Sequence, residues 1–333
     1  MNLPGPSVLV GESPAIQRLR ALIGKVGPTD LPVLIQGPTG SGKELVAHAL
    51  HAASGRGGRL VAFNVCAIPE TLLEAAVFGH TRGGFTGASQ DLPGYLAEAD
   101  RGTAFFDEIS GLPLALQPKL LRALETCDFR PVGARGDRHS DFRLVSATND
   151  QLDGLVARGQ FRADLAYRLR AVVMTVPALN ERLQDVPLLA DYFLRRALKT
   201  DRTEQAVQAA ALDVLLDFDW PGNVRELRHV IETALALSGG QTLGVEEVRE
   251  ALSYGSKTEL HESGGDPRGQ LIATLDRVEW DTAAAARELR VHRATVYRWM
   301  RRLRISPSRC RHVGFASIRA NSHPFAANPA GLR

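Results

Sequence analysis

The chain has 333 residues, of which 44% are hydrophobic and 23% are charged, the composition of an ordinary globular protein. This length allows two or three domains with at least one sizeable core. No run of roughly 18 apolar residues occurs, so we expect no segment to span a membrane. The start of the chain lacks a basic stretch followed by an apolar one, which argues against secretion.

The three cysteines, Cys66, Cys127 and Cys310, are scattered along the chain without CxxC spacing. This arrangement argues against a disulfide framework and against a zinc site. Cysteines used in this way fit a reducing compartment, so we expect a cytoplasmic protein.

Positive charge is concentrated near the C-terminal end of the chain. The segment from Ala286 to His312 contains nine arginines and one glutamate, a local charge of +8. Because the whole chain carries only +3, the remainder carries −5. This asymmetry favours a polyanion-binding end on a mildly acidic body, with a solvated charge run as the alternative.

Short β-rich runs alternate with helix-like stretches in the first half of the chain. Strands are expected at residues 33–35, 60–65, 103–106, 143–147 and 172–176. The long segments between them are typical of crossovers in a parallel sheet that carries helices on its faces. From residue 186 to residue 254 the strand pattern gives way to helical periodicity, which predicts a smaller all-helical domain.

A glycine-rich segment joins the first expected strand to the helix expected after it. The glycines let the backbone curl around a phosphate, so that its N–H groups and the helix N-terminus face the anion. Lys43 then reaches the β- and γ-phosphates. Glu44 stands where Ser or Thr usually contacts magnesium, which leaves more of the metal binding to another acid. The residues expected to bind ATP here are Gly37, Pro38, Thr39, Gly40, Ser41, Gly42, Lys43 and Glu44.

Two carboxylates, Asp107 and Glu108, follow the apolar run from Thr103 to Phe106. At the carboxyl end of a parallel strand they would lie beside the phosphates. We expect Asp107 to hold Mg²⁺ and Glu108 to polarise the attacking water. A surface position is the alternative for such a pair, and the preceding phosphate loop favours the functional interpretation.

The arginine-rich end is predicted to form two helices separated by a short turn. The first helix covers residues 282–289, and the second runs to Leu303. Side chains early in the second helix are placed to face base edges, and later ones to face phosphates. The predicted base contacts are Arg293, Thr295 and Arg298, and the predicted phosphate contacts include Arg301 and Arg302. Val296, Trp299 and Leu303 are expected in the core of this module.

The segment from Val77 to Ala88 resembles the GAFTGA loop of the bacterial enhancer-binding proteins, the AAA+ activators of sigma-54 RNA polymerase. The resemblance extends from about residue 10 to residue 235 and into a Fis-type helix-turn-helix. It implies that the loop contacts sigma-54 through Gly83, Gly84, Phe85, Thr86, Gly87 and Ala88. A glycine-rich turn with Phe85 in the core is the alternative. The chain departs from the family at Gly84, Ala97 and Pro131, and we expect these departures to weaken the coupling to polymerase.

The same resemblance assigns roles to further residues. Asn64 would restrain Glu108, and Thr148 with Asn149 would sense the γ-phosphate. Arg225 would point at the nucleotide of its own subunit, with Asn223 capping the helix and Trp220 in the core. Arg162 and Arg168 would act on the ATP of a neighbouring subunit, with a surface ion pair as the alternative.

The expected fold is thus an AAA+ α/β parallel-sheet domain with an all-helical lid and a C-terminal Fis-type helix-turn-helix. The expected boundaries are a short leader at 1–9, the α/β domain at 10–177 and the lid at 178–254. A linker at 255–269, the DNA-binding domain at 270–306 and a disordered tail at 307–333 follow. With so short a leader we expect no sensor domain, and control by abundance or by a regulator in trans.

The predicted function is that of a sigma-54-dependent activator. Its subunits would form a ring, which we expect to be a hexamer of identical copies or a hetero-oligomer with a paralogue, and would hydrolyse ATP with Mg²⁺. The ring would remodel the closed polymerase–promoter complex while bound to double-stranded DNA upstream. Two alternatives stay open: a DNA-bound AAA+ regulator uncoupled from sigma-54, and a non-enzymatic DNA-binding repressor.

Overall fold

The computed structural model describes residues 9–85, 88–198, 207–240, 242–255 and 267–289, together with residues 296, 299, 300, 303 and 305. The chain divides into two compact units, residues 1–257 and residues 258–333. Within the described residues, no helix has both the length and the apolar composition that crossing a bilayer requires.

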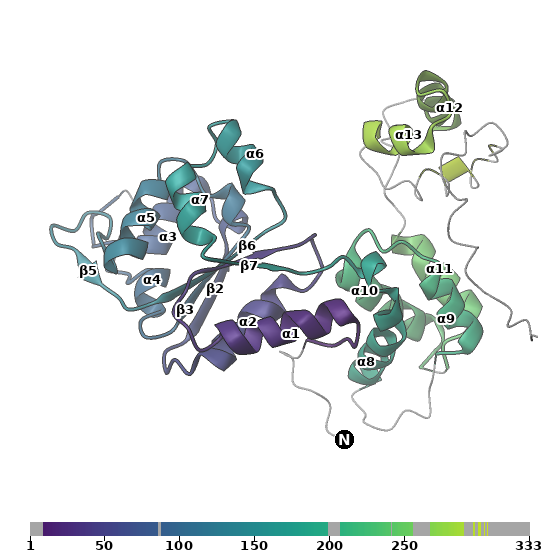
Figure 1. Ribbon diagram of the computed structural model, residues 1–333, viewed down its shortest axis with the longest axis horizontal. Helices are drawn as coiled ribbons and strands as arrows, with labels where there is room; N and C mark the ends of the chain where they lie inside the picture. The colour runs from purple at the N-terminus through teal and green to yellow at the C-terminus, as the bar shows by residue number, and fades with distance from the viewer. Residues whose placement is uncertain are drawn as a thin grey trace, which may run out of the picture. The chain divides into compact units, whose positions relative to one another are not determined.

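A parallel sheet forms the centre of the first unit (Figure 1). Its strands are β1 (Val33–Gln36), β2 (Leu60–Asn64), β3 (Thr103–Asp107), β6 (Arg143–Thr148) and β7 (Val172–Thr175), in the order β2-β3-β6-β1-β7. The predicted strands are all present. β6 lies between β1 and β3, so the carboxyl ends of these three strands meet at one edge. Such an edge is where α/β sheets place their ligand sites.

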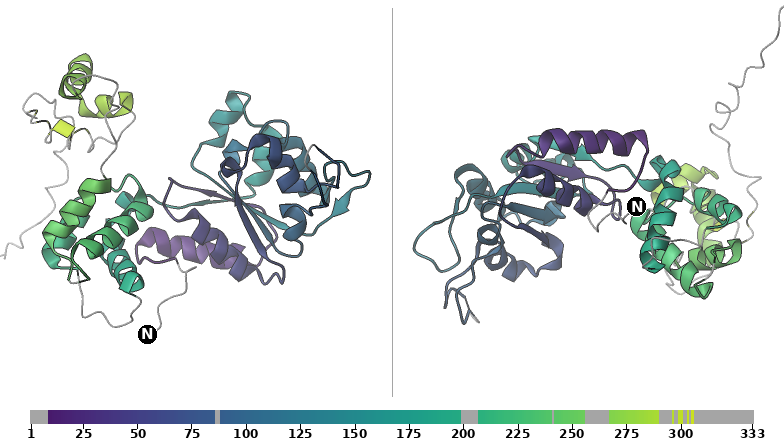
Figure 2. Two further views of the ribbon diagram at one scale, coloured as in Figure 1. Left: turned by 180° about the vertical axis from the view of Figure 1, so that it is seen from behind. Right: turned by 90° about the horizontal axis from the view of Figure 1, so that it is seen from below.

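Helices cover both faces of the sheet, because side chains alternate between the faces along each strand. On one face, Val33 and Ile35 pack with α1 (Pro14–Val26) and α2 (Lys43–Ser54). On the other face, Leu34 and Phe106 pack with helices that include α3 (Glu70–Phe78), α5 (Gln117–Thr126), α6 (Leu152–Ala157) and α7 (Ala163–Leu169). The short helix α4 (Tyr95–Glu98) joins this second layer. Figure 2 shows the two helical layers from behind and from below.

A small antiparallel hairpin interrupts the alternation of strands and helices. Its strands are β4 (Asp128–Phe129) and β5 (Arg138–His139), which pair Asp128 with His139. Short 3-10 turns follow β2 at Val65–Ala67 and β3 at Ile109–Gly111. Two more, Leu179–Glu181 and Leu183–Asp185, lead from β7 into the lid.

The lid consists of helices α8 (Val186–Leu198), α9 (Ala209–Leu216), α10 (Asn223–Leu237) and α11 (Val245–Gly255). Their apolar faces share one core, in which Trp220 is only 1% exposed and donates its indole N–H to the carbonyl of Leu215 at 2.9 Å. The prediction that Trp220 belongs to the lid core is confirmed.

The second unit contains α12 (Pro267–Arg277) and α13 (Thr282–Glu288). Its small core includes Leu271, Leu275, Ala285, Val296 and Trp299, with Leu303 partly buried against it. The predicted core positions at 296, 299 and 303 are therefore confirmed. The predicted DNA contacts Arg293, Thr295, Arg298, Arg301 and Arg302 lie outside the described residues, as do Thr86 and Gly87.

Candidate nucleotide site

The phosphate loop runs from the end of β1 to the start of α2. Gly42 is the N-cap of α2, and the helix begins at Lys43. The first N–H groups of a helix have no partner within the helix, and its dipole favours negative charge at that end. Residues 37–43 thus join a buried strand to a helix N-terminus in the geometry that binds phosphates.

The Lys43 side chain folds back over this loop. Only 7% of it is exposed, and its ammonium donates to the carbonyl of Gly37 at 3.0 Å. The same Nζ lies 3.8 Å from Oε1 of Glu108. The buried ammonium of Lys43 therefore lies between the backbone of the loop and the predicted catalytic carboxylate.

Asp107 ends β3, and Glu108 follows it in a left-handed backbone conformation with φ of +54°. For a residue other than glycine this conformation costs roughly 1–2 kcal/mol. Such strain persists where the surrounding structure imposes it, and functional sites are common among those places. The strained turn separates the two carboxylates, because it directs Glu108 toward Lys43 and leaves Asp107 in line with the strand.

The expected contact between Asn64 and Glu108 is absent from the hydrogen bonds of the described residues. Instead, the Asn64 amide donates to Oδ2 of Asp107 at 3.3 Å, and its oxygen accepts from the N–H of Cys66 at 2.8 Å. The sheet register explains this contact, since β2 and β3 pair Asn64 directly with Asp107. Glu108 lies beyond the pairing, past the left-handed turn.

Cys66 lies next to these carboxylates. Burial raises the pKa of the Cys66 thiol, and the negative charges of Glu108, Asp107 and Asp150 raise it further. A thiolate here would face three acids, so Cys66 lies within the negative charge of the site.

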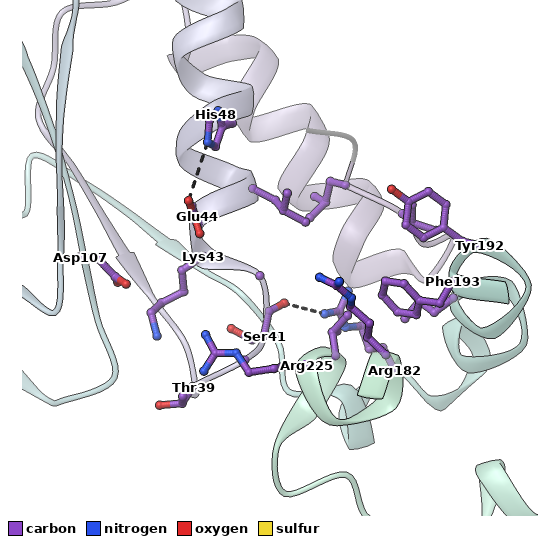
Figure 3. A pocket seen from close by; sticks show the side chains of 18 of the residues that line it. Thr39, Ser41, Lys43, Glu44, His48, Asp107, Arg182, Tyr192, Phe193 and Arg225 are labelled. Carbon is purple, nitrogen blue, oxygen red and sulfur yellow. Dashed lines mark hydrogen bonds and ion pairs between the residues drawn. The ribbon is translucent and has the colours of Figure 1, made fainter. Parts of the chain in front are cut away.

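A cavity of about 480 Å³ opens between the phosphate loop and the lid. Figure 3 shows Lys43 and Asp107 on one side of the loop, and Arg182, Tyr192 and Phe193 on the other. The polar residues that line the cavity include Thr39, Ser41, Lys43, Asp107, Glu108 and Arg225. The apolar residues that line it include Leu9, Val10, Leu45, Leu189, Phe193 and Val224. A polar end beside an apolar end suits a ligand that combines phosphates with a flat ring.

Glu44 lines the same cavity from the first turn of α2. Its side chain is 69% exposed and lies 4.0 Å from Nε2 of His48, one turn later. A group of three or more side chains able to hold a metal does not occur among the described residues. Asp107 with phosphate oxygens nevertheless fits Mg²⁺, which proteins commonly bind through one or two carboxylates and the substrate.

Arg225 lies on α10 and lines the cavity, as expected. The prediction for Asn223 is wrong, because α10 has Gly222 as its N-cap and the Asn223 side chain makes no capping bond. With φ of +54°, Asn223 instead directs its amide to the carbonyl of Thr39 at 3.0 Å, and its oxygen accepts from the N–H of Leu179 at 2.8 Å. The side chain joins the lid to the phosphate loop.

Sequence reasoning missed Arg182. Its side chain is buried, lines the cavity and donates to the carbonyl of Ser41 at 3.0 Å. Burial lowers the pKa of Arg182, and the charge of Asp185 opposes that effect. Within the described residues, the buried Nε of Arg182 and Oγ of Ser41 lack hydrogen-bond partners. No sequence pattern identifies such a residue, since its position depends on how the lid folds back.

Thr148 ends β6 next to the phosphate loop, and Asn149 follows it. The Asn149 amide donates to the hydroxyl of Thr39 at 3.3 Å, and the carbonyl of Thr148 accepts from the N–H of Gly37. Thr148 is fully buried and holds the turn through the N–H of Asp150 at 2.9 Å. Asn149 is thus close to the loop, while Thr148 supports it from behind.

Arg162 and Arg168 do not line the cavity. Both belong to α7 or its N-cap and lie on the surface, where Arg162 pairs with Asp164 at 2.6 Å and Arg168 donates to the carbonyl of Leu124 at 3.3 Å. Between them Tyr167 is 85% exposed. Both arginines thus lie outside the cavity that the phosphate loop and the lid of their own chain form.

The segment that contains Phe85 is anchored at its base. Thr81 donates its N–H to Val132 at 3.0 Å, and Gly84 donates to Thr81 at 2.9 Å. The half-buried ring of Phe85 packs edge-on against His80, with ring centroids 4.9 Å apart. Phe85 is therefore neither in the core nor fully exposed.

Gly84 contacts the neighbouring segment 131–133. A Cβ at Gly84 would lie 2.6 Å from the carbonyl oxygen of Val132, and a Cβ at Gly133 would lie 2.6 Å from the Cα of Gly84. Two places where the chain departs from the family, Gly84 and the segment that begins with Pro131, are thus in contact. Ala97, the third departure, is partly buried against the core beneath α4.

Residues 9–175 match the sigma-54 interaction domain, and residues 180–264 match the AAA+ ATPase lid domain. The chain is 40% identical over 295 residues to the transcriptional regulatory protein ZraR of Salmonella typhimurium, a match that covers 86% of this chain and 67% of ZraR. It is 47% identical over 236 residues to the transcriptional regulator VasH of Vibrio cholerae, a match that covers 70% of this chain and 44% of VasH.

Among solved structures, NtrX from Brucella abortus in complex with ATP is similar, with a TM-score of 0.68 and 31% identity. That similarity covers 89% of this chain and 69% of NtrX. The predicted AAA+ fold, a parallel α/β sheet with a helical lid, is confirmed. The chain belongs to the bacterial enhancer-binding protein family, the sigma-54-dependent transcriptional regulators built on an AAA+ domain.

Proposed function

We propose that this protein is a sigma-54-dependent transcriptional activator that hydrolyses ATP within a ring of its own copies. The ring would use that energy to remodel the closed complex of polymerase and promoter. The observation that supports this most is the cavity in which the phosphate loop, Lys43 and the Asp107–Glu108 pair converge under a lid. The match to the sigma-54 interaction domain supports sigma-54 as the binding partner.

In the proposed reaction, ATP lies with its phosphates on residues 37–43. Lys43 donates to the phosphate oxygens, and Glu108 orients the attacking water and accepts its proton. Asp107, restrained by Asn64, would hold Mg²⁺, which neutralises the charge that develops on the phosphates. Asn149 and Arg225 complete the surroundings of the phosphates from the sheet edge and from the lid.

Assembly is the second part of the proposal. Arg162 and Arg168 lie on the surface of α7, outside the cavity of their own chain. An arginine supplied by a neighbouring copy stabilises the transition state of phosphoryl transfer and is worth about 10³–10⁵ in rate. Hydrolysis would then require a ring, expected to be hexameric, in which α7 of one copy faces the cavity of the next.

The loop and the basic end complete the proposal. Residues 83–88, with Phe85 at the tip, would transmit the motion of the ring to sigma-54. The second unit has a packed helical core, which supports a Fis-type helix-turn-helix whose arginines contact upstream DNA. Binding that depends on phosphate contacts falls steeply with salt, because counterions are released.

The alternative of a regulator uncoupled from sigma-54 has one observation in its favour, the close contact of Gly84 with Val132 at the base of the loop. Transcription in vitro with sigma-54 holoenzyme separates the two. We expect ATP-dependent transcription from duplex promoter DNA, and little need for this protein when the start site is already melted. Hydrolysis without transcription from duplex DNA would favour the uncoupled regulator.

The non-enzymatic alternative is tested by the ATPase rate itself. If the active form is a ring, the rate rises more than linearly with protein concentration until the ring is complete. If the protein did not hydrolyse ATP even at high protein concentration, the DNA-binding repressor would be the one remaining hypothesis.

A further inference from the structure

Three consecutive carbonyls of the phosphate loop accept hydrogen bonds from the lid. The Asn223 amide donates to Thr39 at 3.0 Å, the Arg225 backbone N–H donates to Gly40 at 3.2 Å, and the Arg182 guanidinium donates to Ser41 at 3.0 Å. The donors come from two points of the lid, one from the turn before α8 and two from the start of α10.

Peptide geometry gives these contacts a consequence for the loop. In a planar trans peptide, the carbonyl of one residue and the N–H of the next point in opposite directions. When the carbonyls of Thr39, Gly40 and Ser41 are held toward the lid, the N–H groups of residues 40, 41 and 42 point away from it. The N–H of Ser41 donates to the carbonyl of Pro38 within the loop, at 3.2 Å. Among the described residues, the N–H groups of Gly40 and Gly42 donate to no other group, so they remain for a phosphate.

The lid reaches the loop at a position that admits no side chain. Gly40 has φ of +76°, and a Cβ there would lie 2.3 Å from the carbonyl oxygen of Gly222 in the lid. Asn223 itself is held at φ of +54°, a conformation that asparagine tolerates better than most residues. The turn before α10 is thus strained and in direct contact with the loop.

Arg182 connects the same contact to the other wall of the cavity. It lies in the short turn that also contains Asp185, whose buried carboxylate accepts from the N–H of Glu12 at 2.7 Å and from the N–H and hydroxyl of Ser13 at 2.8 and 2.6 Å. Those residues follow Leu9 and Val10, which line the apolar end of the cavity. One lid turn therefore holds both ends of the site.

From these contacts we infer that Asn223 and Arg182 are positioning residues that set the phosphate-binding shape of the loop before nucleotide arrives. Because the same bonds hold the lid down, nucleotide binding and lid closure stabilise each other, and this coupling is reciprocal. The inference rests on the proposed nucleotide-binding function and adds to it how the lid acts on the phosphates.

Two substitutions of Asn223 isolate its donor in the full chain. Asn223→Asp keeps an oxygen for the N–H of Leu179 and replaces the donor that faces Thr39. Asn223→Gly removes the donor without adding charge and suits the positive φ. A loss that both variants share arises neither from the new charge nor from the Leu179 bond. Asn180→Asp, on an exposed residue of the preceding turn, is the matched control for charge.

The measurement is ADP affinity by calorimetry, together with hydrogen exchange of the amides of residues 39–43 in nucleotide-free protein. We expect both Asn223 variants to bind ADP at least about tenfold more weakly, as the loss of a buried hydrogen bond implies. Exchange of the loop amides should accelerate in both, while Asn180→Asp matches the unmodified protein. A variant that merely unfolds would show faster exchange throughout the core strands as well.

Arg182→Met provides an independent second test, with Arg182→Lys as the conservative variant that retains a charged donor. Partial recovery of ADP affinity by lysine relative to methionine supports the inference. Unchanged ADP affinity and unchanged loop exchange in both Asn223 variants would overturn it. If the unmodified protein itself failed to bind ADP, the proposed function would fall instead, and these variants would not be needed to show it.

Discussion

Glu108 combines a strained backbone with a defined partner. Its φ of +54° turns the side chain out of the strand direction and toward the ammonium of Lys43, 3.8 Å away. Asp107 stays in register with Asn64 and accepts its amide. Two adjacent acids thus have different surroundings, which is how one site assigns them different tasks.

The substitution Glu108→Gln keeps the size of the side chain and removes its basicity. We expect ATP binding to persist while turnover falls by roughly 10²–10⁴, the usual contribution of general base catalysis. ATP affinity by calorimetry and phosphate release at saturating ATP provide the two readouts. Near-normal turnover would show that another group activates the water.

Cys66 reports on the charge of the same site. Because burial and the neighbouring carboxylates raise the pKa of its thiol, less thiolate is present at a given pH than in a free cysteine. In a variant with Cys127 and Cys310 replaced by serine, iodoacetamide should modify Cys66 more slowly than free cysteine at pH 8. The pH profile of the reaction should also be displaced to higher pH. Reaction as fast as that of free cysteine would contradict this charge assignment.

At the scale of elements, the segment 79–85 packs directly against the segment 131–133. Backbone hydrogen bonds join Thr81 and Gly79 to Val132, and Gly84 approaches Val132 too closely for a side chain. In general, a glycine gives a loop more backbone freedom than other residues do. The structure gives a different reason for glycine, since space at the base of the loop is already taken by the neighbouring backbone.

Phe85 packs on His80 at the end of the segment 79–85, and it does not contact the cavity. Phe85→Ala should therefore retain ATPase activity within about twofold and lose most transcription activation. Parallel assays of phosphate release and of transcription with sigma-54 holoenzyme check this. Equal transcription by the variant and the unmodified protein would eliminate the contact role of the ring.

At the scale of the whole molecule, the cavity and the arginines of α7 are separate surfaces of one chain. If a ring brings them together, a copy with a defective loop still offers its arginines to a neighbour. A copy without those arginines still offers an intact cavity. Activity would then belong to the interface between copies.

Mixing two inactive variants tests this directly. Lys43→Ala and Arg168→Ala should each lose most ATPase activity, and their mixture should recover a substantial part of it, because some interfaces combine an intact cavity with an intact arginine. Phosphate release at a fixed total protein concentration is the measurement. A mixture no more active than either variant alone would place the arginine's action within its own chain.

The sheet, the phosphate loop and the family could all be predicted from the sequence. The patterns that predicted them are the apolar β-rich runs, the spacing from Gly37 to Lys43 and the acids after β3. Each of these patterns involves only residues that are close together in the sequence. The two-residue strands β4 and β5 are too short to leave such a pattern.

The remaining contacts could be identified only from the folded structure. That Asn64 bonds Asp107, that Asn223 reaches Thr39 and that Arg182 is buried against Ser41 all depend on residues brought together from distant parts of the chain. Strand register fixes the first of these contacts, and the way the lid folds back fixes the other two. Strand register and the position of the lid cannot be read from any single residue, because each results from packing the whole core.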